Sequence, residues 1–188
     1  MCPEPRPGTR AVHGNNDSYL KAGVLLLLYP VEDQLYLVFT RRTDRVVSHQ
    51  GQISFPGGRK EPEEDIQTAA LRETHEELGL STESIRILRS LTPLYIPRSG
   101  FCVYPYVAFS EERPEFHPSP DEVAEVIEVP LQHLRDSHNI KREHRIISGM
   151  KVMVPFYAFH DHKIWGATAM VLAEFLAIVE KAEKRKME

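Results

Sequence analysis

The sequence predicts a mixed α/β fold, of the α+β or α/β sandwich type. Strand-like runs rich in Val, Ile, Leu, Tyr and Phe are interspersed with helix-forming segments, of which only two are long. The chain has 188 residues, 41% of them hydrophobic, which suits one domain with a sizeable core. We therefore expect a single domain at residues 19–188, after a flexible arm at residues 1–18 that carries Pro, Gly and Asn.

Strands are expected where β-branched and aromatic residues cluster between turn residues. In chain order, the expected strands are residues 22–29, 35–40, 51–55, 85–91, 101–109 and 151–160. The first two should form a hairpin because Pro30 and polar residues separate them. The third should end before Pro56, which two glycines follow.

Three segments have helical character: residues 63–78, 130–136 and 167–186. The first follows Pro62, contains no Gly or Pro, and is followed by Gly79, where a capping glycine belongs. The last becomes basic toward its end, as the helix dipole favours.

Composition excludes several classes of partner. The formal net charge of −4 gives no general affinity for a polyanion, so no nucleic-acid partner is expected. The longest apolar run, residues 23–29, is much shorter than the roughly 20 residues that cross a bilayer, so no membrane partner is expected. Cys2 and Cys102 make no disulfide framework, which favours the cytoplasm. A homodimer is left open.

The first long helix carries three carboxylates on one side. Glu73, Glu76 and Glu77 stand at i, i+3 and i+4, and the apolar positions Leu71 and Leu78 lie on another side. A solvated helix face is the simplest explanation of such a charge run. However, the like-charged pair of Glu73 and Glu77 is destabilising unless something bridges it. Three convergent carboxylates suit a hard divalent cation, so we predict an Mg²⁺ or Mn²⁺ site.

Glu64 and Arg72 complete this region. Glu64 lies half a turn out of phase with Glu73, so it cannot share the acidic face of a regular helix. A bend of the chain at the helix start would instead bring Glu64 to Arg72. We expect this pair to orient the acidic helix.

The spacing of these residues resembles the Nudix box. The matching positions are Gly58, Glu64, Arg72, Glu73, Thr74, Glu76, Glu77, Gly79 and Leu80. The resemblance implies an α/β/α sandwich with a mixed sheet and a loop–helix–loop metal site. It also implies hydrolysis of a nucleoside diphosphate linked to another group, with Glu73, Glu76, Glu77 and the carbonyl of Gly57 as metal ligands.

Two flanking segments are similar to the coenzyme A diphosphatase branch of this family. Residues 41–58 resemble its Arg-Ser, His-x-Gly-Gln and Phe-Pro-Gly-Gly signature, with Thr43 in place of the serine. Residues 164–169 resemble its Trp-Gly-x-Thr-Ala segment, where Trp165 fits a core or hinge position better than a nucleobase contact. The resemblance implies hydrolysis of CoA or acyl-CoA to 3′,5′-ADP and 4′-phosphopantetheine or its acyl form.

Cationic residues near the box agree with a phosphate-rich substrate. Arg41, Arg42 and Arg45 form a local basic cluster, and arginine can bind phosphate through two hydrogen bonds. His49 and Gln52 are added to the predicted substrate-binding set. The alternatives are exposed loop charges for the arginines, a turn histidine for His49 and a supporting role for Gln52.

The general base has two candidate sources. One is a glutamate of the box, and the other is Glu122, which follows Pro120 and Asp121 at the start of a regular element. For Glu122, an acid at the start of an element with no catalytic role is the alternative.

Other functions remain possible at this stage. ADP-ribose or a dinucleotide is the alternative substrate. A non-catalytic Nudix-fold binding module is the alternative class of protein, but such modules usually have a degraded box, and here the box is intact.

Overall fold

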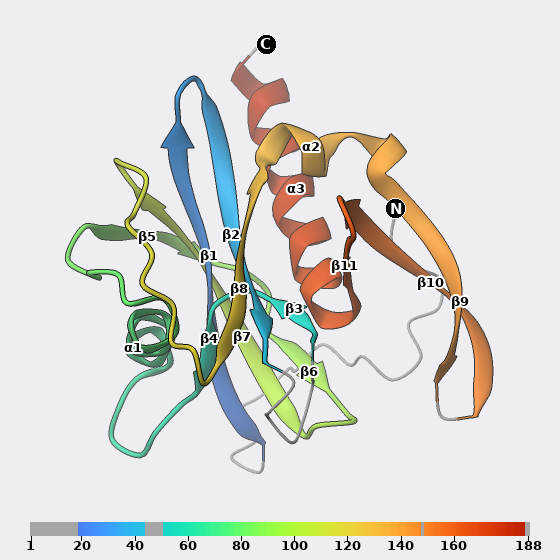
Figure 1. Ribbon diagram of the computed structural model, residues 1–188, viewed down its shortest axis with the longest axis horizontal. Helices are drawn as coiled ribbons and strands as arrows, with labels where there is room; N and C mark the ends of the chain where they lie inside the picture. Colours follow the sequence, from blue (N-terminus) through green and yellow to red (C-terminus); the bar gives the residue numbers. More distant parts are fainter. Residues whose placement is uncertain (1–18, 44–50, 148, 187–188) are drawn as a thin grey trace.

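The computed structural model describes residues 19–43, 51–147 and 149–186 (Figure 1). The arm expected at residues 1–18 lies outside this range. So do two of the predicted substrate-binding residues, Arg45 and His49.

Strand β1 (Leu20–Val31) is central to the larger sheet. It pairs antiparallel with β2 (Gln34–Arg42) and β4 (Gly57–Arg59), and parallel with β7 (Phe101–Ser110). The other strands of this sheet are β3 (Ile53–Ser54), β5 (Ile85–Ser90), β6 (Leu94–Ile96) and β8 (Val123–Pro130). The sheet is therefore mixed, as predicted.

A helix covers each face of this sheet (Figure 1). Successive residues of β1 point to opposite faces. Leu25 therefore joins the core cluster of Leu78, on helix α1 (Ile66–Leu78), whereas Leu26 joins that of Leu172, on helix α3 (Gly166–Lys186). This arrangement confirms the predicted α/β/α sandwich. Among the described residues, no helix has the length and apolarity needed to cross a bilayer.

A second, antiparallel sheet packs beside α3. It contains β9 (Ile140–Ile147), β10 (Met150–Phe159) and β11 (His162–Trp165). Helix α2 (Leu131–Arg135) and a 3₁₀ turn (Ser137–Asn139) connect it to β8. Tyr157 and Ile164 of this sheet share one core cluster with Leu172 of α3.

Several elements differ from expectation. Strands β4, β6, β8, β9 and β11 are not among those expected from the sequence. β4 looks like a turn because it contains two glycines, and β9 carries charged residues at half of its positions, so neither has an apolar β pattern. The first helix begins at Ile66 instead of residue 63, because Glu63 has a positive φ of 69° and Asp65 caps the helix.

The candidate active site

The acidic helix α1 has well-defined ends. At its N-terminus, the carboxylate of Asp65 accepts hydrogen bonds from the backbone N–H of Thr68 at 2.8 Å and from its hydroxyl at 2.9 Å. At its C-terminus, Gly79 has φ +64°, and its N–H donates to the carbonyl of His75 at 2.7 Å. These contacts fix which residues occupy the last two turns.

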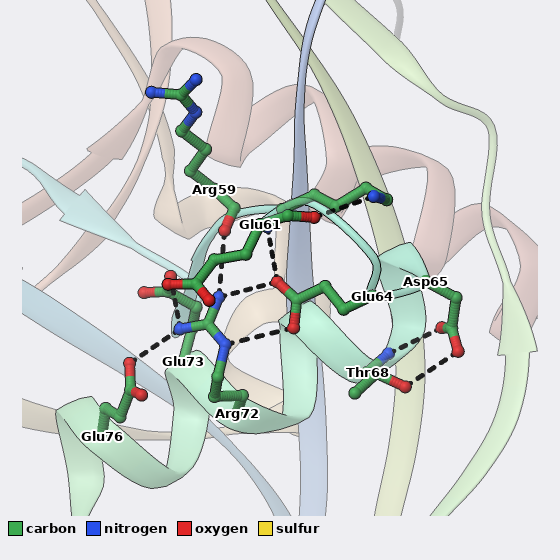
Figure 2. Close-up of polar contacts among 9 residues, drawn as sticks. Arg59, Glu61, Glu64, Asp65, Thr68, Arg72, Glu73 and Glu76 are labelled. Carbon is green, nitrogen blue, oxygen red and sulfur yellow. Dashed lines mark hydrogen bonds and ion pairs between the residues drawn. The ribbon is translucent and has the colours of Figure 1, made fainter.

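Arg72 is the centre of the polar network on α1 (Figure 2). Its Nη2 and Nε donate to the two carboxylate oxygens of Glu64 at 2.9 and 3.2 Å, so the predicted contact is present. Its Nη1 lies 3.0 Å from Glu73 and 2.9 Å from Glu76, and Nη2 also donates to the carbonyl of Arg59 at 3.1 Å. The hydrogen bond from Arg72 holds the pKa of Glu64 below its usual value.

The three box carboxylates occupy different environments. The side chain of Glu76 is 49% exposed and that of Glu73 is 19% exposed, whereas Glu77 is 3% exposed. The expectation that all three face away from the packed side of α1 is wrong for Glu77. The reason is β4, whose Gly57 N–H donates to Glu77 Oε2 at 3.1 Å and so adds a wall that the helix pattern did not reveal.

Two glycines allow β4 to approach the helix this closely. A Cβ on Gly58 would lie 2.2 Å from Glu73 Oε2. Gly57 has φ +137°, and a Cβ there would lie 2.3 Å from the carbonyl oxygen of Gly23. A side chain at Gly58 would displace the carboxylate of Glu73, and one at Gly57 would push β4 away from β1.

Burial raises the pKa of Glu77 to about 7. The Gly57 N–H and the charge of Arg42 oppose this shift, whereas Glu73 and Glu122 increase it. Burial also raises the pKa of Glu73. Partly desolvated carboxylates in mutual repulsion make a site that an additional cation would stabilise.

The donor set fits the predicted metal, although the side chains are not gathered around one point. Within the described ranges, no group of three or more His, Cys, Asp or Glu residues is placed to hold a metal ion. Arg72 holds Glu73 and Glu76, and the Gly57 N–H holds Glu77. The oxygen donors match Mg²⁺ or Mn²⁺ in chemistry, and α1 supplies them from adjacent turns.

Arg42 and Arg41 lie on opposite faces of β2. Arg42 shares the face of Val38, toward α1, and its charge acts on Glu77. Arg41 points to the other face, where its Nε donates to Glu125 on β8 at 3.0 Å. Only Arg42 of this pair therefore faces the acidic helix. Its Nε atom is buried and has no hydrogen-bond partner among the described residues.

Gln52 and Glu122 flank Arg42. The carbonyl of Gln52 accepts a hydrogen bond from the backbone N–H of Arg42 at 3.1 Å. Glu122 ends the connection from β7 to β8, and Ser119 in that connection donates its N–H to the carbonyl of Glu77 at 2.9 Å. The carboxylate of Glu122 acts electrostatically on Glu73 and Glu77. The structure thus brings Glu122 to the acidic helix.

The partners of Arg41 and Trp165 could not be predicted from the sequence. Glu125 contacts both Arg41 and, at 3.2 Å, His162 of β11. The guanidinium of Arg145 lies 3.8 Å from the ring centre of Trp165, which is half-buried, as expected for a core or hinge position. These contacts involve β8, β9 and β11, which have no clear strand pattern, so the sequence offered no register from which to find them.

The fold and the site define a class of protein. The NUDIX domain family matches residues 20–148, and the chain belongs to this family. The family resemblance found in the box is therefore confirmed.

Several Nudix hydrolases are similar to this chain over most of its length. The mitochondrial coenzyme A diphosphatase NUDT8 of Homo sapiens is 35% identical over 158 residues, covering 82% of this chain and 66% of the relative. The Nudix hydrolase NudL of Photorhabdus laumondii is 34% identical over 148 residues, covering 77% of each chain. The chain spans 56% of another relative, the mitochondrial Nudix hydrolase 15 of Arabidopsis thaliana. It thus matches less than two thirds of the human and Arabidopsis proteins.

Solved structures agree on the fold. A MutT/nudix family protein from Enterococcus faecalis has a TM-score of 0.57 at 22% identity, covering 90% of this chain and 65% of that chain. The MutT protein from Methanosarcina mazei Go1 has a TM-score of 0.54 at 16% identity, covering 90% and 96%. At these identities the likeness concerns the fold alone.

Proposed function

We propose that this protein is a Nudix diphosphatase that hydrolyses CoA or acyl-CoA to 3′,5′-ADP and 4′-phosphopantetheine or its acyl form. The observation that carries the proposal is the convergence of Arg42 and Glu122 on the carboxylates of α1. A guanidinium beside several carboxylates suits phosphoryl transfer to water. The choice of CoA is supported by the similarity to human and mouse proteins named as coenzyme A diphosphatases, and by the flanking motifs.

The predicted metal is Mg²⁺ or Mn²⁺, with Glu73, Glu76, Glu77 and the carbonyl of Gly57 as its ligands. When bound, such a metal offsets phosphate charge and makes water a better nucleophile. Arg42 binds a phosphate oxygen and orients the substrate. Glu122 or a box glutamate holds the proton that the attacking water releases. Arg72 orients the carboxylates of Glu73 and Glu76 through its ion pairs with them.

The test is a substrate panel with purified protein, Mg²⁺ or Mn²⁺, and product analysis. The substrates are CoA, acetyl-CoA, dephospho-CoA, ADP-ribose and NADH. We expect the highest kcat/KM with CoA or acetyl-CoA, and 3′,5′-ADP as a product. A much higher kcat/KM with ADP-ribose or NADH would reject CoA as the substrate, and binding without turnover of any compound would indicate a non-catalytic module.

Cytoplasmic location and a possible homodimer remain predictions. Relatives are named as mitochondrial in human and peroxisomal in mouse, so compartments differ among similar proteins. Cell fractionation would test the first prediction, and light scattering of the purified protein would test the second.

A further inference from the structure

Thr43 joins the end of β2 to the turn that carries Glu122. Its backbone N–H donates to the carbonyl of Glu122 at 3.1 Å. Its hydroxyl donates to the carbonyl of Asp121 at 3.0 Å. Thr43 itself is buried, at 7% exposed.

The strand ladder alone does not fix this turn. The pairing of β2 with β8 shifts between Arg41, which faces Glu125, and Arg42, which faces Val123. This irregularity marks the end of the paired region, since Val123 is the first residue of β8. Beyond it, the contacts of Thr43 continue the connection to Asp121 and Glu122.

The turn is also tied to α1. The N–H of Val123 donates to the carbonyl of Ser119 at 2.8 Å, and the N–H of Ser119 donates to the carbonyl of Glu77 at 2.9 Å. Arg42 directly precedes Thr43, and its positive charge lowers the pKa of Glu77. Thr43 thus lies between the two groups that approach the carboxylates of α1.

We propose that Thr43 is a positioning residue that holds Glu122 at the acidic helix, at a fixed separation from Arg42. This inference rests on the proposed function, because Glu122 must take part in the reaction. The hydroxyl is the essential group, since it is the side-chain donor that ties the end of β2 to the carbonyl of Asp121. Serine supplies the same donor, which agrees with the serine of the branch signature, whereas valine has the shape of threonine without the donor.

The test combines three single variants and one double variant. Thr43→Val removes the hydroxyl at nearly constant volume, Thr43→Ser restores it, and Glu122→Gln removes the carboxylate charge. The double variant joins Thr43→Val to Glu122→Gln. Kinetics are measured with the diphosphate that the wild type hydrolyses best, so rejection of CoA in the substrate panel does not decide this test. Thr40→Val is the control, since Thr40 is a fully buried threonine of β2 whose hydroxyl lies 3.5 Å from that of Ser54.

We expect Thr43→Val to lower kcat about 10-fold or more with a smaller change in KM, and Thr43→Ser to stay within about 3-fold of the wild type. In the Glu122→Gln background, Thr43→Val should lower kcat further by less than about 3-fold, because both changes act through one group. Thr40→Val should lower the melting temperature without changing kcat.

Three results would overturn the inference: equal losses from Thr43→Val in both backgrounds, failure of serine to restore kcat, or unimpaired Glu122→Gln. If the wild type hydrolyses none of the diphosphates, both the inference about Thr43 and the proposed function are overturned. If Thr43→Val does not fold, the pair Thr43→Ser and Thr43→Ala makes the same comparison, because these variants differ by one oxygen atom.

Discussion

Arg41 and Arg42 show that adjacent cations can have different partners. Arg42 faces α1, whereas Arg41 is paired with Glu125 on the opposite face of β2. A basic cluster in sequence therefore becomes two separate sites in the sheet, because the side chains of a strand alternate.

We predict that Arg42→Ala raises KM for CoA about 10-fold or more, since a charged hydrogen bond to phosphate contributes about 1.5–3 kcal/mol. If Arg42 binds the 3′-phosphate, the change will be smaller for dephospho-CoA. Arg41→Ala is the matched control and should change both KM values little. Equal losses on the two substrates would assign Arg42 to the diphosphate instead.

The raised pKa of Glu77 should make the stability of the metal-free protein depend on pH. Its pKa is about 7 in the folded protein, against 4.5 as the ordinary value. Between these values the folded state keeps a proton that the unfolded state releases, so the free energy of unfolding should fall as pH rises. The full effect is about 3 kcal/mol, present below pH 4.5 and lost by pH 7.

Urea unfolding in EDTA between pH 5 and 7.5 measures this effect. Glu77→Gln should flatten the curve, because it removes the buried carboxyl that takes up the proton. Parallel curves for the wild type and Glu77→Gln would show that Glu77 does not titrate in this range.

The helical spacing of Glu73, Glu76 and Glu77 could be predicted from sequence because it depends only on α1. Their burial could not, because it depends on β4. That strand consists of two glycines and an arginine, and it is fixed by pairing with β1, a contact distant in sequence. The ion pair of Glu64 and Arg72 could be predicted because Glu64 lies just before α1 and Arg72 lies within the same helix, close in sequence.

The C-terminus of α1 connects two elements of the site. His117 donates its N–H to the carbonyl of Leu78 at 2.7 Å, and Gly79 packs under His117. The same connection leads on to Glu122. Displacement of His117 should therefore disturb the site as well as the helix end.

We predict that Gly79→Ala destabilises the protein by about 3 kcal/mol or more and lowers kcat, since it combines backbone strain with a steric clash. Its φ is +64°, and a Cβ would lie 2.5 Å from the carbonyl oxygen of His117. Gly100→Ala is the control, because φ is +72° there but no atom lies within 4 Å of the added Cβ. It should cost only about 1–2 kcal/mol, from the left-handed backbone.

Thermal unfolding and kcat of both variants are the measurements. Similar losses of stability in Gly79→Ala and Gly100→Ala would mean that His117 moves away from the added Cβ at little cost.

At the scale of elements, long apolar strands and both long helices were predictable, since their patterns are local. β8 and β9 were not. β8 carries two glutamates that are partnered only after folding: Glu125 binds Arg41, and Glu128 accepts hydrogen bonds from Tyr29 and Arg113. Such residues break the apolar pattern, although the folded strand satisfies them.

The whole molecule is held together around α3. Leu172 is fully buried, in a core cluster that contains residues from both sheets. The two sheets should therefore unfold in one transition.

We predict that Leu172→Ala lowers the stability of both sheets together, by about 2–5 kcal/mol. Far-UV circular dichroism reports the whole fold, and the fluorescence of Trp165, the only tryptophan, reports the second sheet. The urea midpoints reported by the two probes should fall by the same amount. A fluorescence transition at a lower urea concentration than the circular dichroism transition would show that the second sheet unfolds by itself.

The parallel pairing of β1 with β7 has a consequence during synthesis. Leu20 pairs with Phe101 and Leu28 with Phe109, so one edge of β1 has no partner until β7 leaves the ribosome. At about 5–20 residues per second, some 80 residues take about 4–16 s to translate. For that interval the nascent chain exposes a leucine-rich strand edge, which is a target for chaperones and for pairing with other chains.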